Sequence, residues 1–87
     1  MDASVVDLST EEIFNRAACV FNSLDEVTKA MVLSSDDRDK RHGIEYVDDM
    51  IDNLYPNLNE DNFRGIFIAV YNSIICGPYY LGNRIAS

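Results

Sequence analysis

Residues 63–76, which read FRGIFIAVYNSIIC, decide the fold of this chain. Apolar side chains surround most of the helical circumference here: Phe63, Ile66, Phe67, Ile68, Ala69, Val70, Tyr71, Ile74, Ile75 and Cys76. A helix that is apolar nearly all round packs against neighbours on several sides. We therefore expect Phe63–Cys76 to be the central helix. A strand at 66–71 is the competing interpretation, because these residues also have strand propensity, but nothing else in the chain offers a partner strand.

Both ends of this central segment carry helix-boundary residues. Asn59 follows a short turn and is a good N-cap for a helix starting just after it. Gly77 stands where a C-cap glycine belongs, and Pro78 follows it. The tail at 79–85 is rich in aromatic and apolar side chains, and we expect it to fold back over the bundle.

Working outward, the chain begins its first helix near Ser9. Ser9 and Glu12 fit a capping box, in which each side chain accepts a hydrogen bond from the backbone of the other. Apolar side chains then recur at helical spacing and make one face: Ile13, Phe14, Ala17, Ala18, Phe21 and Leu24. The lead-in before Ser9 can tuck Val5, Val6 and Leu8 against the core.

A second capping box, Ser23 to Glu26, predicts a short helix at about 24–33 with Ser23 as its N-cap. Its buried side chains are expected to be Val27, Met31 and Ala30. The pattern leaves open whether the chain bends at Ser23 or continues as one helix.

The polar residues 34–42 are either a loop or the exposed first turns of a third helix with Ser35 as N-cap. Gly43 weakens a helix there by about 1 kcal/mol relative to alanine. The helix is plain from Ile44 onward, and Pro56 ends it because a residue before proline avoids the helical conformation. Its apolar face is Ile44, Val47, Met50, Ile51, Leu54 and Tyr55.

These segments predict an all-α protein, a compact bundle of about four helices joined by short connections. A chain of 87 residues has room for one domain, so we expect 1–87 to be a single helical domain.

The formal net charge of −8 narrows the kinds of partner. An acidic chain repels phosphate backbones and anionic membranes, so we expect no direct nucleic-acid or membrane binding. No stretch is long and apolar enough for a membrane span, and the start of the chain lacks signal-peptide features, which predicts a cytoplasmic protein. The charge favours a basic protein partner.

No pattern for catalysis, a metal or a cofactor is found, so we do not expect an enzyme. His42 is the single histidine and lies in the most charged stretch. Asp37 and Asp39 are spaced like calcium ligands, but Arg41 and His42 occupy positions where such a loop needs a ligand and a glycine. The two cysteines, Cys19 and Cys76, are expected to be buried small hydrophobes.

The most informative cluster is acidic: Glu45, Asp48, Asp49 and Asp52 stand at i, i+3, i+4 and i+7. At about 100° per residue, they share one side of a helix. Like charges at this spacing cost a few tenths of a kcal/mol each. The pattern is either a solvated face or a surface complementary to a basic partner.

We take the second interpretation as the functional hypothesis: a small non-catalytic inhibitor that covers a basic, nucleic-acid-handling protein. The predicted partner-binding residues are Asp36, Asp37, Asp39, Glu45, Asp48, Asp49 and Asp52, with Tyr46 and Tyr55 beside them. The alternative is a homo-oligomeric structural or adaptor module, because the apolar fourth helix and residues 79–81 together can exceed what one chain buries, leaving a homodimer surface.

In size, charge and helicity, the chain is similar to small acidic helical inhibitors made by bacteria and phages. These include immunity proteins that block nuclease toxins, and phage proteins that block host or defence enzymes. The resemblance rests on general character and assigns a role to no residue.

Overall fold

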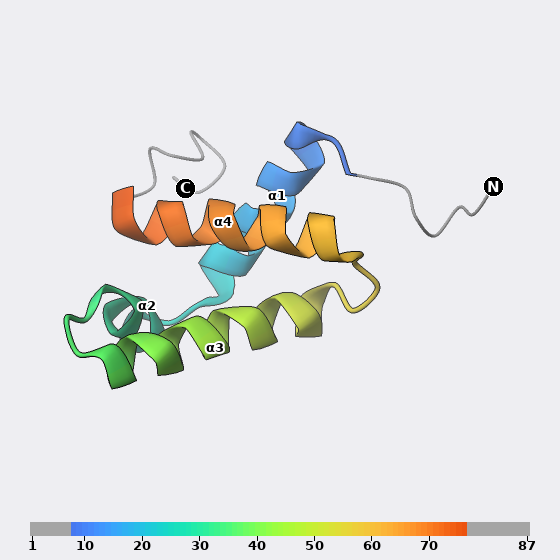
Figure 1. Cartoon of the computed structure of the whole chain (residues 1–87). Coiled ribbons are helices and arrows are strands. Elements are labelled where there is room, and N and C mark those ends of the chain that lie inside the picture. Colours follow the sequence, from blue (N-terminus) through green and yellow to red (C-terminus); the bar gives the residue numbers. More distant parts are fainter. Residues whose placement is uncertain (1–7, 77–87) are drawn as a thin grey trace.

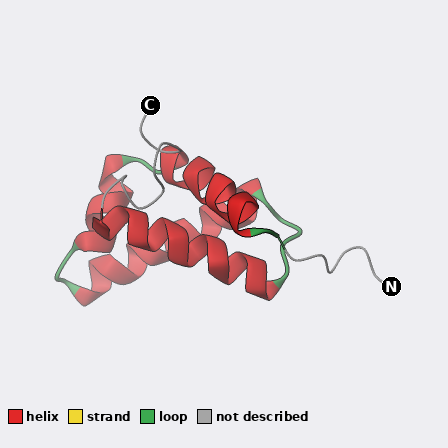
Figure 2. Cartoon of the chain, turned by 90° about the horizontal axis from the view of Figure 1, so that it is seen from above, coloured by secondary structure: helices red, strands yellow, loops and turns green. Residues whose placement is uncertain are grey.

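The computed structural model describes residues 8–76, which form four helices and no strand (Figures 1 and 2). The helices are α1 (Thr10–Ser23), α2 (Glu26–Leu33), α3 (Asp37–Leu54) and α4 (Glu60–Cys76). The predicted all-α bundle is confirmed, and the strand interpretation of 66–71 is wrong because these residues lie within α4.

Some sequence predictions concern residues outside the described range. These are the packing of Val5 and Val6, the helix stop at Gly77 and Pro78, and the path of the tail at 79–85. Leu8 is described. It packs against the core, and its backbone N–H donates to Oδ1 of Asn62 at 3.1 Å.

The start of α1 follows the predicted capping box. The Glu12 N–H donates to Oγ of Ser9 at 3.1 Å, and the Ser9 N–H donates to Oε1 of Glu12 at 2.9 Å. This exchange satisfies two backbone donors that a helix start otherwise leaves without partners.

The second capping box is wrong in its position. Ser23 is the last residue of α1, and its hydroxyl donates to the Cys19 carbonyl at 2.9 Å. Leu24 is extended, so α1 and α2 are separate helices. Asp25 is the N-cap of α2 instead, because it directly precedes the first residue of that helix. Its carboxylate accepts a hydrogen bond from the Thr28 N–H at 2.7 Å.

Residues 37–42 are helical, which decides between the two interpretations of the polar stretch. The N-cap is Asp36 rather than Ser35, and its carboxylate accepts from the Arg38 N–H at 3.0 Å. At the other end α3 stops at Leu54, as the proline at 56 predicts. The Asn59 cap of α4 is also confirmed, because its Oδ1 accepts from the Asn62 N–H at 2.7 Å.

The helices associate as two pairs. α1 packs mainly against α4, and α2 packs mainly against α3. α4 also contacts α2 and α3, which supports its central place in the bundle. α3 and α4 run antiparallel beside each other (Figure 1) but touch much less than the partners within each pair. α4 is therefore covered much more closely by α1 than by α2 or α3.

The core is made of side chains from all four helices: Ala17, Ala18, Val20, Leu24, Val32, Val47, Ile51, Ile66, Ala69, Val70 and Ile74. Val20 and Val32 were not predicted. Val27 and Leu54 were expected to be buried but are 67% and 41% exposed. The buried residue of α2 is Val32, and Val27 and the exposed Ala30 leave the helix about 140° and 160° from it. Leu54 is the last residue of α3.

Gly43 has a packing role that its helix propensity did not indicate. The glycine is buried, and a Cβ placed on it would lie 2.7 Å from the Val32 backbone nitrogen and 3.0 Å from the Met31 carbonyl carbon. A real Cβ does not approach backbone atoms so closely. The absence of a side chain at 43 therefore allows α2 to lie against α3.

The prediction of buried cysteines is wrong. Cys19 and Cys76 are both exposed free thiols. The buried neighbours of Cys19 are Ala18 and Val20, whose side chains leave α1 about 100° to either side of it. Cys76 is the last residue of α4.

Candidate functional site

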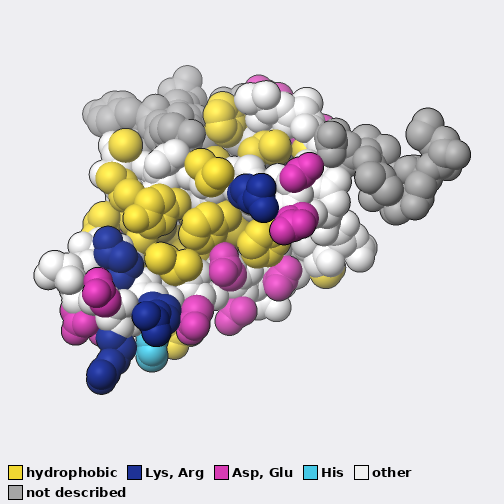
Figure 3. Space-filling model, in the orientation of Figure 1, with side chains coloured by type: hydrophobic (Ala, Val, Ile, Leu, Met, Phe, Trp, Pro, Cys, Tyr) yellow, Lys and Arg dark blue, Asp and Glu magenta, His cyan; other side chains and the backbone are white. Residues whose placement is uncertain are grey.

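The acidic stripe is the set Glu45, Asp48, Asp49 and Asp52 on α3. Three of these side chains are exposed, and Asp48 is partly buried. Within residues 8–76, the ion pairs are Lys29–Glu26 at 3.6 Å and Arg64–Glu60 at 3.5 Å, so no ion pair neutralises the stripe. Figure 3 shows the acidic side chains gathered along α3 and at the adjoining start of α4.

Asp48 is the member of the stripe whose ionisation the fold disturbs. Burial raises the pKa of its carboxyl above the usual value, and the neighbouring charges of Asp49, Asp52 and Glu45 raise it further. Both effects oppose the ionised form. A cation brought to this position by another molecule would favour the ionised form and so offset the repulsion from the neighbouring carboxylates.

The stripe lies on a ridge between two hollows, and its adjacent members face different ones. The α3–α4 hollow has a volume of ≈ 350 Å³. Its lining residues are Ile44, Asp48, Glu60, Phe63, Arg64 and Phe67. The α2–α3 hollow has a volume of ≈ 560 Å³. It is lined by Ser23, Leu24, Asp25, Val27, Thr28, Met31, Tyr46, Asp49, Met50 and Asn53.

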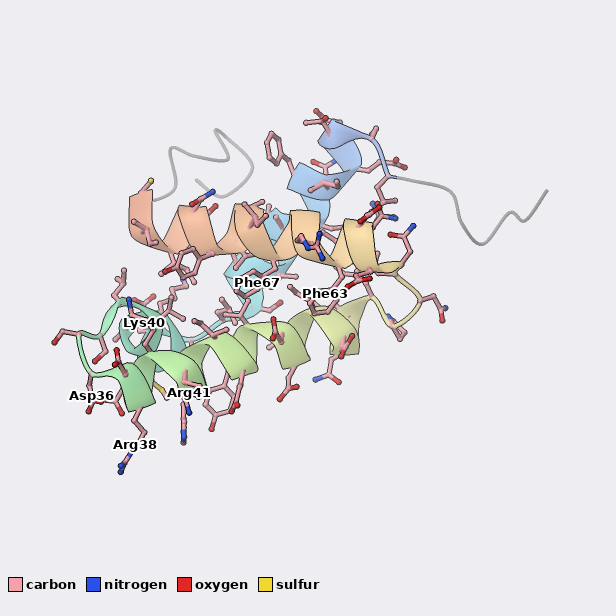
Figure 4. The ribbon with its side chains drawn as sticks, viewed as in Figure 1. Asp36, Arg38, Lys40, Arg41, Phe63 and Phe67 are labelled. Atoms are coloured by element: carbon pink, nitrogen blue, oxygen red, sulfur yellow. The ribbon has the colours of Figure 1, made fainter. Side chains whose placement is uncertain are left out.

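The structure does not join Asp36, Asp37 and Asp39 to the stripe as a uniform acidic surface. They stand at the start of α3 among Arg38, Lys40 and Arg41. Figure 4 shows Arg38 and Arg41 extending from α3 on the side away from α4. Asp36 is also engaged as the N-cap of α3. This end of the helix therefore carries both acidic and basic side chains. The number of acidic residues in this part of the sequence does not by itself indicate this.

The two predicted tyrosines lie in different surroundings. Tyr46 is 54% exposed and lines the α2–α3 hollow together with Asp49. Tyr55 is partly buried at the end of α3, where the Arg16 guanidinium lies 5.5 Å from its ring centroid. Burial and a hydrogen bond with the Cys19 thiol raise the pKa of Tyr55. Tyr55 therefore packs against α1, while Tyr46 is available to a partner.

An apolar surface on α4 borders the acidic stripe. The sequence predicts that its side chains belong to the core. Ile68 and Ile75 on α4 are 47% and 50% exposed, and Phe63 and Phe67 are only partly buried. Figure 3 shows hydrophobic side chains spread over α4 and toward α3, with acidic side chains along one border. The sequence indicates this surface through the wide apolar arc of α4. That arc is wider than the side of α4 against which α1 packs.

His42, the single histidine, is exposed on α3. Among residues 8–76, no three His, Cys, Asp or Glu side chains are arranged to hold a metal ion. The described surface combines the acidic stripe of α3 with exposed apolar side chains of α4.

None of the described helices has the length and apolar character to cross a membrane. Comparison with protein-family models, with curated proteins and with solved structures finds no match for this chain.

Proposed function

We propose that this protein is a non-catalytic inhibitor that binds and covers a basic surface of a protein partner. The observation that carries the proposal is the acidic stripe on α3, which no ion pair within residues 8–76 neutralises. Unpaired like charges destabilise a free protein slightly, and they become favourable when a basic surface faces them. Such charge complementarity increases the rate of association.

The class of partner follows from the same charge. Nucleases and other nucleic-acid-handling proteins expose basic grooves or stripes that bind phosphates. An acidic helix of the kind formed by residues 45–52 can occupy such a groove and exclude the nucleic acid. A toxin's immunity protein and a phage blocker of a host or defence enzyme are two versions of this function.

The test uses a triple variant, Asp48→Lys, Asp49→Lys and Asp52→Lys, made on the full chain. Wild type and variant are used in parallel to capture proteins from the source cell, and association with the purified partner is then measured at two salt concentrations. We expect the variant to associate at least about tenfold more slowly, and salt to slow wild type, because exposed charges are screened within about 10 Å.

A matched control separates the stripe from net charge. Glu11, Asp61 and Glu26 are exposed carboxylates on other helices, so reversing these three changes total charge equally while leaving the stripe intact. The control should associate at nearly the wild-type rate. A partner that is itself acidic, or equal rates for the stripe variant and wild type, would refute the proposal.

A homo-oligomeric adaptor is the second candidate, favoured by the exposed apolar residues Ile68 and Ile75. Light scattering at two protein concentrations distinguishes the candidates. A mass that doubles with concentration, in the absence of any captured basic partner, supports the adaptor.

A further inference from the structure

We infer that the α3–α4 hollow is a docking groove for an amphipathic helix of the partner protein, with apolar residues on its inner face and lysine or arginine along its edge. This inference rests on the proposed function and specifies which part of the partner is recognised. It commits to this hollow rather than to the α2–α3 hollow across the ridge.

The floor of the groove is apolar and incompletely covered. Phe63 and Phe67 point from α4 toward α3 (Figure 4), and Ile44 of α3 lines the same hollow. The Phe67 ring stacks on Tyr71 with centroids 5.9 Å apart, which extends the aromatic surface by another turn of α4. Aromatic rings held in this way are typical anchors for a partner's apolar side chains.

The edge of the groove carries one uncompensated charge. Arg64 and Glu60 line the hollow but form an ion pair with each other, at 3.5 Å. Asp48 lines the same hollow, and no ion pair or hydrogen bond joins its carboxylate to another residue within 8–76. The charge that remains is negative, and it lies next to the phenylalanine rings. A ligand that complements both features is apolar on one side and cationic beside it.

The backbone chemistry of the walls favours a helical ligand. Both walls are helices, whose backbone groups bond internally, so the groove offers no strand edge to an extended peptide. A ligand entering an apolar groove must satisfy its own backbone hydrogen bonds, and a helix does so. Amphipathic helices that place i, i+3, i+4 and i+7 anchors in a hydrophobic groove are an established mode of recognition.

The same charge argues against a second copy of this chain, which carries a net charge of −8 and would bring further carboxylates toward Asp48. The chain's own segment 77–87 supplies one cation, Arg84, whereas a partner helix can place several cations along the acidic stripe that borders the groove. The experiment below therefore includes a measurement that identifies the segment 77–87 as the occupant.

The probe is a labelled synthetic helical peptide of about 18 residues, with leucines at i, i+3, i+4 and i+7 and lysines beside them. A counterpart peptide has glutamate in place of every lysine. Binding to the full-length protein is measured by fluorescence anisotropy. We expect the basic peptide to bind and the acidic peptide not to bind.

Two pairs of variants locate the site. Phe67→Ser and Asp48→Asn change the groove. The matched controls are Val27→Ser, which changes the α2–α3 hollow, and Glu11→Gln, which neutralises an exposed carboxylate on α1 outside the stripe. We expect Phe67→Ser to weaken binding by about tenfold and Asp48→Asn by about fivefold, and each control by less than about twofold. Asp48→Asn removes no packing, so its result holds even if Phe67→Ser fails to fold.

Equal losses from Asp48→Asn and Glu11→Gln, or no binding of the basic peptide, overturn the groove while leaving the acidic-face inhibitor to its own test. Two measurements on the free protein also overturn it. Nuclear Overhauser contacts between Tyr80 and Phe67 would assign the groove to the chain's own tail. A dimer that Phe67→Ser dissociates would assign it to a second copy.

Discussion

Gly43 lies against Val32 so closely that a Cβ at position 43 would be 2.7 Å from the Val32 backbone nitrogen. Helix propensity and packing therefore make opposite predictions for Gly43→Ala. Propensity predicts a gain of about 1 kcal/mol, whereas the close backbone approach requires α2 to move away from α3. We expect packing to dominate, with a net loss of about 1–3 kcal/mol, measured by urea unfolding.

Gly65 provides the control for this prediction, because its nearest neighbour is the flexible end of the Ile13 side chain, Cδ1, at 3.1 Å. Gly65→Ala should be close to neutral or stabilising, because the Ile13 side chain can shift by a few tenths of an ångström. A Gly43→Ala variant as stable as Gly65→Ala would show that the α2–α3 approach is not tight.

Ile66 and Phe67 are neighbours on α4, and their burial differs. Ile66 is 0% exposed, whereas Phe67 is partly buried at the edge of the hollow. Ile66→Ala should cost about 2–5 kcal/mol, which is enough to unfold much of so small a domain. Phe67→Ala should cost less than the about 3–5 kcal/mol typical of a fully buried phenylalanine. Thermal unfolding followed by circular dichroism compares the two, and an equal loss would place Phe67 in the core.

The start of α2 distinguishes two candidate caps. Asp25→Ala removes the carboxylate that accepts from the Thr28 N–H at 2.7 Å, so it should lower the free energy of unfolding by about 1 kcal/mol. Ser23→Ala removes only an exposed hydroxyl that donates to the Cys19 carbonyl, and should have little effect. The reverse order, measured by chemical denaturation, would place the cap at Ser23.

The pKa of Asp48 makes a prediction about pH. Burial, followed by the charges of Asp49, Asp52 and Glu45, raises the pKa of Asp48 above 3.8. Folding therefore favours the protonated form, so this group's contribution to stability is complete below pH 3.8 and is lost as pH rises through the raised pKa. Asp48→Asn, which stays neutral, should be more stable than wild type at pH 7 by a few tenths of a kcal/mol.

That advantage should shrink as the pH is lowered through the raised pKa, because wild-type Asp48 itself then becomes protonated. Glu60 and Arg64 line the same hollow from α4 and remain unchanged in both proteins. Val27→Ser changes no titratable group and should differ from wild type by the same amount at every pH. If Asp48→Asn is less stable than wild type at pH 7, then burial and the neighbouring carboxylates do not raise the pKa of Asp48.

Acid should nevertheless destabilise the protein as a whole. Hydrogen bonds with Ser9 lower the pKa of Glu12, and hydrogen bonds with Thr28 lower the pKa of Asp25. Each of these groups contributes stability above its unfolded pKa and loses it as pH falls through the lowered value. We expect the urea concentration at the unfolding midpoint of wild type to decrease as the pH is lowered below 4. The decrease should be smaller in a variant that carries both Glu12→Gln and Asp25→Asn.

Local sequence was sufficient for much of the secondary structure, since caps and helix stops depend on neighbouring residues. The Ser9–Glu12 box, the Asn59 cap and the proline at 56 each bound a helix where the sequence predicts one. The N-cap predictions that were wrong each involve two possible capping side chains that lie one or two residues apart. Asp25 replaces Ser23 and Asp36 replaces Ser35, because each pair offers two oxygen acceptors to one helix start.

The candidate site was predictable only as a charge pattern. The spacing of Glu45, Asp48, Asp49 and Asp52 by itself determined that they share one side of a helix, because the helical repeat fixes it. Three features depend on where α2 and α4 lie: Asp48 and Asp49 line different hollows, Tyr55 packs against α1, and Phe67 is partly buried at the edge of the core. These positions are set by long-range packing, including the contact of Gly43 with Val32, to which no local periodicity refers.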